Sequence, residues 1–314
     1  MITILASRAS AIIYNLLYGR DGGRTFILPA NICPIVPITF FKAGISFEFV
    51  DISSKTLHMD LEQTERQLKT RRYGGLLYAH TYGDPSIPYD FFSLIKKQYP
   101  ELLIIDDRCL CIPDLVNDPA TAADVTLYST GYAKIIDLGY GGFAYLRDNV
   151  NYHSQVLPFH HSDLEAVEKS YKRSIEAGEQ YPYIDSNWLQ TDLDLPAWPE
   201  FTERVRIAKE SSIAHRQSIN AVYNSLIPPG LRLGEEYQLW RFNLRLPDKK
   251  KTLEDIFNAG LFASSHYASL GGILGPGKFP AAKHLADEVV NLFNDIHYTL
   301  EMAEKTAKIV LGSL

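Results

Sequence analysis

The chain has 314 residues, of which 46% are hydrophobic and 22% are charged, which is typical of a soluble globular protein with one large domain or two unequal ones. The net charge of −6, and basic runs no denser than PDKKKTLED at 247–255, argue against a nucleic-acid or membrane-surface partner. The cysteines Cys33, Cys109 and Cys111 are too few for a disulfide framework, and no second ligand pair accompanies them, so a reducing compartment is expected and a zinc site is not.

The first 17 residues, MITILASRASAIIYNLL, predict a short strand followed by a helix. Arg8 interrupts the apolar run and no positive region precedes it, so the segment does not have the pattern of a signal peptide. No apolar run elsewhere reaches the length of a membrane span. We therefore expect a cytoplasmic protein.

The first half of the chain alternates strand-like and helix-like segments. The predicted strands, rich in β-branched and aromatic residues, are 24–30, 46–52, 74–80, 101–107, 124–130 and 141–147. The predicted helices between them are 10–18, 34–44, 59–69 and 87–100, with Asp60 as a helix cap. This alternation predicts an α/β fold with a mostly parallel central sheet and helices on both faces.

The pattern changes after about residue 150. A polar helix is predicted at 160–180, an irregular connection at 181–201 and a long helix at 200–226. A strand at 237–247 and helices at 252–262 and 281–311 then predict a smaller C-terminal α+β domain. We expect a large α/β domain over residues 1–180, and a connection with the small domain over 181–314.

Polar side chains gather where three predicted strands end. His80 and Tyr82 follow the first of these strands, Asp106 and Asp107 end the second, and the segment STGYAK at 129–134 follows the third. Because ligands bind beyond the carboxyl ends of strands in an open α/β sheet, these ends predict an active site.

Lys134 is the one charged side chain in the run STGYAKII, and an ammonium group in an otherwise uncharged segment suggests a specific role. A lysine, an aspartate and a serine–glycine cradle for phosphate suit a pyridoxal phosphate (PLP) enzyme, in which the lysine bonds to the aldehyde and a carboxylate keeps the ring nitrogen protonated. A lysine that merely extends to the solvent is the alternative.

The same residues resemble a known family, the DegT/DnrJ/EryC1/StrS sugar aminotransferases, whose fold is the fold-type I PLP-transferase. The resemblance rests on RTFILPANICPIVPITFFKAGISFEFVDI, AHTYGDP, LLIIDDRC and ADVTLYSTGYAKIIDLGYGGFAYLRD, which match family segments in order over most of the chain. The family's Glu in its Gly-Glu-Gly-Gly turn is Tyr140 here, Leu110 replaces its Gln or His, and Ile32 or Cys33 replaces its stacking aromatic.

This resemblance implies roles for individual residues. Lys134 would hold the cofactor and move protons, Asp107 would pair with the pyridine nitrogen, and Ser129 would bind the phosphate. The remaining cofactor positions that it implies are Ser7, Arg8, Ala9 and Cys33. Pocket-wall or substrate positions would be His80, Tyr82, Trp240, Arg241, His266 and Tyr267.

The implied protein is a homodimeric PLP-dependent aminotransferase. It would move an amino group from an amino acid, glutamate by expectation, to a nucleotide-linked keto sugar for polysaccharide biosynthesis, without nucleic acid, membrane or metal. Two alternatives stay open, since fold does not fix function. One is another PLP reaction such as sugar dehydration. The other is a non-catalytic homologue that binds a ligand or a partner.

Overall fold

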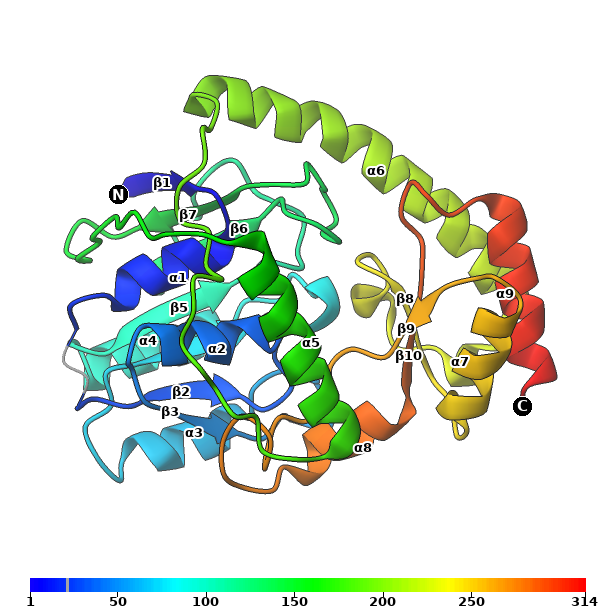
Figure 1. Cartoon of the computed structure of the whole chain (residues 1–314), viewed down its shortest axis with the longest axis horizontal. Helices are drawn as coiled ribbons and strands as arrows, with labels where there is room; N and C mark the ends of the chain where they lie inside the picture. Colours follow the sequence, from blue (N-terminus) through cyan, green and yellow to red (C-terminus); the bar gives the residue numbers. More distant parts are fainter. Residues whose placement is uncertain (21–22) are drawn as a thin grey trace.

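The computed structural model describes residues 1–20 and 23–314. Within them a seven-stranded sheet forms in the first half of the chain and a three-stranded sheet in the second. Figure 1 shows the two sheets in separate parts of the molecule, with the long helix α6 (Trp198–Leu226) reaching from one part to the other.

The large sheet has the order β1-β7-β6-β5-β4-β2-β3. Strands β2 to β6 run parallel to one another, whereas β7 is antiparallel to both β1 and β6. The strand bounds are Ile2–Ala6 (β1), Phe26–Pro29 (β2), Phe47–Val50 (β3), Gly75–Ala79 (β4), Leu103–Asp107 (β5), Val125–Ser129 (β6) and Gly142–Leu146 (β7). The mostly parallel sheet predicted from the strand–helix alternation is confirmed.

Helices cover both faces of this sheet, because alternate strand residues point to opposite sides and both sides are apolar. Leu28, Leu77 and Ile105 belong to one buried cluster, and their neighbours Leu76 and Ile104 belong to another. The helices of the first half are Ala9–Leu17 (α1), Ile35–Lys42 (α2), Leu61–Leu68 (α3), Tyr89–Gln98 (α4) and His161–Ala177 (α5). α1 and α2 pack on the first cluster, and α3 and α4 on the second.

The predicted cap of α3 is confirmed. The Asp60 side chain accepts a hydrogen bond from the Gln63 N–H at 2.9 Å, which satisfies one of the unpaired amides of the first helical turn. The cap fixes where α3 begins after β3.

The small sheet, in the order β8-β10-β9, is built from Phe242–Arg245 (β8), Ala263–Ser264 (β9) and Val289–Leu292 (β10). The helices around it are Lys249–Asn258 (α7), Pro280–Glu288 (α8) and Leu300–Gly312 (α9). The continuous helix predicted at 281–311 is wrong, because β10 interrupts it. Val289 and Val290 are β-branched and fully buried, and β10 pairs with β8 on one side and with β9 on the other. These tertiary contacts make the segment a strand although its sequence has helical periodicity.

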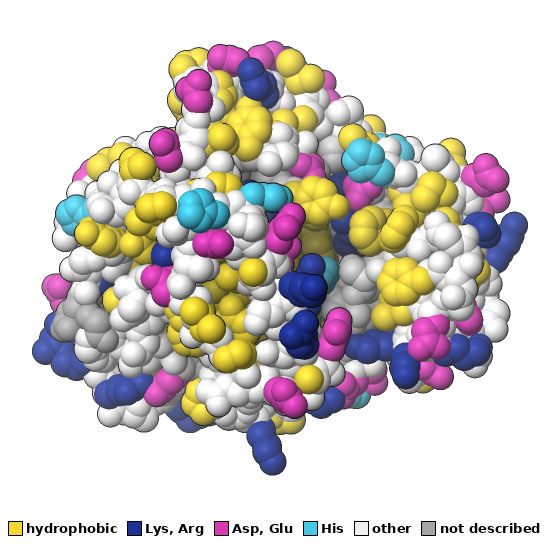
Figure 2. All heavy atoms as spheres, in the orientation of Figure 1, with side chains coloured by type: hydrophobic (Ala, Val, Ile, Leu, Met, Phe, Trp, Pro, Cys, Tyr) yellow, Lys and Arg dark blue, Asp and Glu magenta, His cyan; other side chains and the backbone are white. Residues whose placement is uncertain are grey.

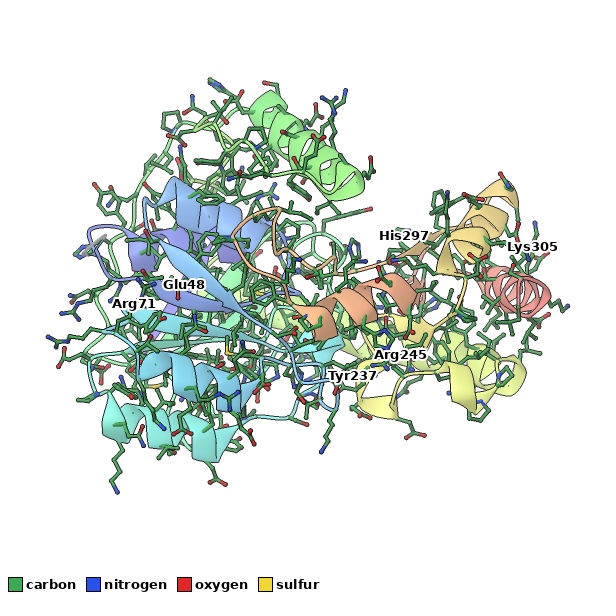
Figure 3. All side chains as sticks on the ribbon, turned by 90° about the horizontal axis from the view of Figure 1, so that it is seen from below. Glu48, Arg71, Tyr237, Arg245, His297 and Lys305 are labelled. Carbon is green, nitrogen blue, oxygen red and sulfur yellow. The ribbon has the colours of Figure 1, made fainter. Side chains whose placement is uncertain are left out.

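The second half of the chain packs back onto the first sheet at several points. The Asp51 carboxylate accepts from the N–H groups of Ala281 and Ala282, both at 2.9 Å, and so caps α8. Tyr237, which Figure 3 labels where the two parts meet, donates its hydroxyl to the Thr56 carbonyl at 2.7 Å. The domain division at residue 180 remains a prediction, since residues 270–289 share a buried cluster with the large sheet.

The face of the molecule in Figure 2 carries acidic and basic side chains side by side, and its surface is hollowed between the two parts. Along residues 1–20 and 23–314, every helix is too short or too polar to cross a membrane. No cluster of histidine, cysteine and acidic side chains in the same residues could hold a metal ion.

Candidate active site

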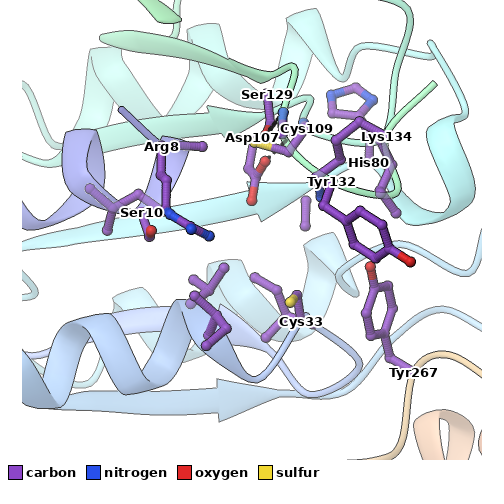
Figure 4. A pocket seen from close by; sticks show the side chains of 18 of the residues that line it. Arg8, Ser10, Cys33, His80, Asp107, Cys109, Ser129, Tyr132, Lys134 and Tyr267 are labelled. Carbon is purple, nitrogen blue, oxygen red and sulfur yellow. Dashed lines mark hydrogen bonds between the residues drawn. The ribbon is translucent and has the colours of Figure 1, made fainter. Parts of the chain in front are cut away.

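A cavity of about 250 Å³ lies at the carboxyl ends of the parallel strands. Its wall includes the residues that end β4, β5 and β6, the first turn of α1 and the segment before α2. Figure 4 shows Asp107, Ser129, Lys134 and Arg8 around one space, with Cys33 on the opposite side. The sheet topology thus brings together side chains from distant parts of the sequence.

Asp107 ends β5 and lines the cavity with a side chain that is 7% exposed. Its Oδ1 accepts from the Cys109 N–H at 3.0 Å, and the Cys109 thiol interacts with the same carboxylate. The carboxylate is therefore held by Cys109 and lines the cavity, where it can accept a further hydrogen bond.

The preceding residue, Asp106, is fully buried and points to the other face of the sheet. It accepts from His80 Nε2 and from Arg108 Nε, both at 2.7 Å, and forms an ion pair with the Arg108 guanidinium. Burial acts to raise the pKa of Asp106, but the charges of His80 and Arg108 hold it below its usual value. The two adjacent carboxylates therefore have different surroundings. Asp106 is paired with His80 and Arg108 inside the protein, and Asp107 faces the cavity.

Lys134 lies in an irregular segment, residues 130–141, which we call the lysine loop. Asp137 shapes the loop, because its carboxylate accepts from the N–H groups of Ala133 at 2.7 Å and Gly139 at 2.8 Å. The Leu138 N–H donates to the Thr130 carbonyl at 2.8 Å and closes the turn. The Lys134 side chain is half-buried and lines the cavity, so the alternative of a lysine that only extends to the solvent does not describe its position.

The other end of the cavity is made by the first turn of α1 and by Ser129. The first N–H groups of a helix have no partner within it, so the amides of Ala9 and Ser10 are suited to bind an anion. Gly142 lies so close to this turn that an added Cβ would stand 2.6 Å from the Ala9 Cα. Arg8 adds a guanidinium, whose pKa is lowered by burial although Glu168 acts in the opposite direction. Hydroxyl, amides and guanidinium together form an anion-binding corner.

One wall of the cavity is aliphatic where the family resemblance implies an aromatic. Ile13, Ile32, Cys33, Ile35 and Val36 form this wall. Burial raises the pKa of the Cys33 thiol, and burial together with Asp107 raises that of Cys109, so both sulfur atoms stay neutral and behave as small hydrophobic groups.

Some predicted site residues lie behind the cavity wall instead of lining it. Tyr267 lines the cavity, and Trp240 stacks behind it with ring centroids 6.2 Å apart, followed by Tyr82 at the same spacing. The Tyr82 hydroxyl donates to the His266 carbonyl at 2.6 Å. These rings support Tyr267 from behind.

The remaining predicted positions divide in the same way. Arg8, Ala9, Cys33 and His80 line the cavity, together with the three central residues already placed. Ser7 does not: its hydroxyl donates to the Gln190 carbonyl at 2.7 Å. Arg241 does not either, because it pairs with Asp295 at 2.9 Å, and the His266 side chain is exposed.

Several lining residues were not expected from the sequence. The main ones are Ser10, Asn31, Thr81 and Glu168. Ser10 follows directly from the helix start at Ala9 and could have been found. Glu168 could not, because the sequence shows a polar helix at α5 but not that this helix lies beside the cavity.

No protein-family model and no curated protein sequence matches the chain. Solved structures do match over nearly its whole length. A DegT DnrJ EryC1 StrS aminotransferase from Brucella abortus is 16% identical with a TM-score of 0.69, over 99% of this chain and 86% of that one. S. venezuelae DesV is 17% identical with a TM-score of 0.70, over 98% and 83%. Spr1654 from Streptococcus pneumoniae, in its PLP form, is 15% identical with a TM-score of 0.70, over 99% and 88%.

At these identities the likeness establishes the fold. The chain has the fold of the PLP-dependent aminotransferases, and the structures that share it include those of the DegT/DnrJ/EryC1/StrS group. The fold predicted from the motif order is confirmed.

Proposed function

We propose that the chain is a PLP-dependent aminotransferase that moves an amino group from an amino acid, glutamate in the first instance, to a nucleotide-linked keto sugar. One observation carries the proposal. A single cavity gathers a lysine, a carboxylate and an anion-binding corner from two strand ends, the loop that follows one of them and one helix N-terminus.

The residues present fit the cofactor part by part. The anion-binding corner of Ser129, Arg8 and the α1 amides suits its phosphate, and Asp107 suits its ring nitrogen. Gly142 has no Cβ, so the strand can pass close to Ala9 without displacing the first turn of α1, whose amides form part of the corner. The neutral, aliphatic wall at Ile32 and Cys33 suits the face of the ring.

The chemistry of the chain's own residues follows from these positions. Bound PLP would supply a conjugated ring that accepts electrons from a carbon next to the reacting nitrogen. Lys134 would hold the cofactor through its amine, and as a free amine it would carry a proton from and to carbon as general base and acid. Asp107 would hold the proton on the ring nitrogen.

The assignment of substrate and assembly rests on the resemblance alone. A sugar acceptor, a role in polysaccharide biosynthesis, a homodimer and a cytoplasmic location are parts of the proposal that the family resemblance supports. Sedimentation analysis checks the dimer, and a panel of keto sugars and keto acids checks the acceptor.

The direct test is spectroscopic. Purified protein is mixed with PLP and its visible absorbance is recorded before and after addition of glutamate. Borohydride reduction and peptide mass spectrometry then locate any covalent adduct. We expect an adduct on Lys134 and none in Lys134→Ala, and we expect glutamate to bleach the visible band.

The other outcomes select between the alternatives. An adduct that glutamate and other amino acids leave unchanged favours another PLP reaction such as sugar dehydration. A colourless protein without an adduct rejects both enzyme readings and leaves the non-catalytic homologue.

A further inference from the structure

Three successive carbonyl groups of the lysine loop accept hydrogen bonds from the second half of the chain. The Trp240 indole N–H donates to Ala133 at 2.8 Å, and the Arg216 Nη2 group donates to Lys134 at 3.1 Å. The Ser212 hydroxyl donates to Ile135 at 2.5 Å. The backbone on both sides of Lys134 is thus held by α6 and by the segment before β8, and not by the large sheet alone.

Arg216 is the centre of this arrangement. It lies on α6, is 2% exposed, and directs its Nη1 group to the Trp240 carbonyl at 2.7 Å and to the Asn294 side-chain oxygen. Its Nε donates to the Ser212 hydroxyl at 3.2 Å. One side chain therefore joins the lysine loop to two segments of the C-terminal part.

The partners of Arg216 are unusual for a buried cation. Among residues 1–20 and 23–314, no carboxylate forms an ion pair with it, and nearly all its acceptors are carbonyl and amide oxygens. Burial, reinforced by the nearby charge of Arg241, lowers the pKa of Arg216 to about 10, so it remains a cation at neutral pH.

A buried charge without a countercharge is costly, and a hydrophobic side chain would attach α6 to its neighbours at lower cost. What a hydrophobic residue cannot do is fix several carbonyl groups at once, which the planar guanidinium does with its five N–H donors. Arginine at this position is therefore better explained by the backbone that it orients than by packing.

We propose that Arg216 is a positioning residue for Lys134. It holds the backbone carbonyl of the lysine so that the side-chain amine points into the cavity, and it ties that position to residues 239–240 and to Asn294. The proposal rests on the proposed function for the role of the Lys134 amine, but the contact itself can be tested without the cofactor.

The experiment compares Arg216→Met, Arg216→Lys and a matched control, Arg206→Met. Arg206 lies on the same helix, but its side chain is 55% exposed and pairs with Glu203 and Glu210. Hydrogen–deuterium exchange of residues 130–141 is measured without cofactor. The rate at which PLP becomes borohydride-fixed to Lys134 is measured separately, beside its non-covalent affinity.

We expect Arg216→Met to fold. Its increase in exchange rate over the wild type should be larger in the lysine loop than in β5 and β10. The adduct should form about tenfold more slowly, as for the loss of a hydrogen bond from a charged donor. Arg216→Lys should recover part of the rate, and Arg206→Met should match the wild type. A wild-type exchange pattern and adduct rate in Arg216→Met, or exchange raised equally throughout the chain, would overturn the proposal.

Two further outcomes are separable. If Arg216→Met does not fold, Ser212→Ala decides: faster exchange in the loop supports the proposal, and unchanged exchange overturns it. If the wild type forms no adduct, the proposed function fails, while the exchange measurement still decides whether Arg216 orders the loop.

Discussion

The indole N–H of Trp240 donates to the carbonyl oxygen of Ala133 at 2.8 Å, one residue before Lys134. Ala133 has φ of 60°, in the left-handed region that non-glycine residues seldom adopt, so the bond holds a strained turn in place. The same ring stacks between Tyr82 and Tyr267. Trp240 therefore supports both the lysine loop and the cavity wall without lining the cavity itself.

Replacing Trp240 by Phe removes this N–H and leaves an aromatic ring in the stack. We expect the free energy of unfolding to fall by about 2 kcal/mol, from one lost hydrogen bond and a small cavity. Urea unfolding measures the change. Trp198→Phe is the control, because the described residues offer no acceptor to its indole N–H, and equal losses in the two variants would argue that the Ala133 bond adds nothing.

Asp106 and Asp107 are adjacent, yet substitution of Asp107 should reduce mainly activity and substitution of Asp106 mainly stability. Asp107→Asn should keep the fold, because the Asp107 carboxylate forms no ion pair within the described residues and an amide oxygen can still accept from the Cys109 N–H, and it should remove most of the activity. Asp106→Asn should cost about 3 kcal/mol of unfolding free energy, since the charged Arg108 is left buried without its countercharge. Urea unfolding and assays of both variants check this pair, and a stability loss larger in Asp107→Asn than in Asp106→Asn would contradict it.

Much of the site was predictable because it depends on local patterns. The runs LLIIDD and DVTLYST are apolar on both faces, which marks central strands, and parallel strands place their carboxyl ends at one edge. Asp107 and Ser129 follow from this argument, as does the nearness of Lys134. The helix predicted from Ser10 starts one residue earlier, at Ala9.

What could not be predicted depends on contacts between distant residues. Arg216 and Trp240 approach the lysine loop from 82 and 107 residues away in the chain, and no local signal marks their partners. β10 was hidden because VVNL lies between helical sequences, and only pairing with β8 and β9 makes it a strand. Tertiary contacts override local preference at such positions.

His58 makes the stability depend on pH. It is 3% exposed, and its Nε2 lies 3.6 Å from the Asp84 carboxylate. Burial and then the charge of His80 lower the pKa of His58 to about 4, although Asp84 and Asp106 oppose the shift. Because the unfolded chain binds this proton near pH 6.5, the unfolded state gains protons first, and stability falls as the pH drops from about 6.5 to 4.

We expect this decrease to reach about 3 kcal/mol at pH 4 from this one group. His58→Gln cannot bind the proton, so its unfolding free energy should change less between pH 7 and 4.5 than that of the wild type. The Tyr78 and Tyr237 rings that contact His58 do not titrate in this range, since burial raises the pKa of both phenols. Parallel pH curves for variant and wild type would assign the acid sensitivity to other groups.

Gly142 begins β7 where the strand passes the first turn of α1. A Cβ at this position would stand 2.6 Å from the Ala9 Cα and 2.7 Å from the Arg8 carbonyl carbon, and both of these atoms are backbone atoms that cannot rotate away. In Gly142→Ala the helix start and the strand must therefore separate, which should cost about 1–3 kcal/mol of unfolding free energy.

The same separation displaces the Ala9 and Ser10 amides from the anion-binding corner. We therefore expect Gly142→Ala to bind PLP and free phosphate more weakly, while pyridoxal, which lacks the phosphate, reacts with Lys134 at a rate closer to that of the wild type. Gly230→Ala is the control, because its added Cβ meets no atom within 4 Å. A Gly142→Ala variant that loses affinity for pyridoxal as much as for PLP would place the damage at Lys134 and not at the helix N-terminus.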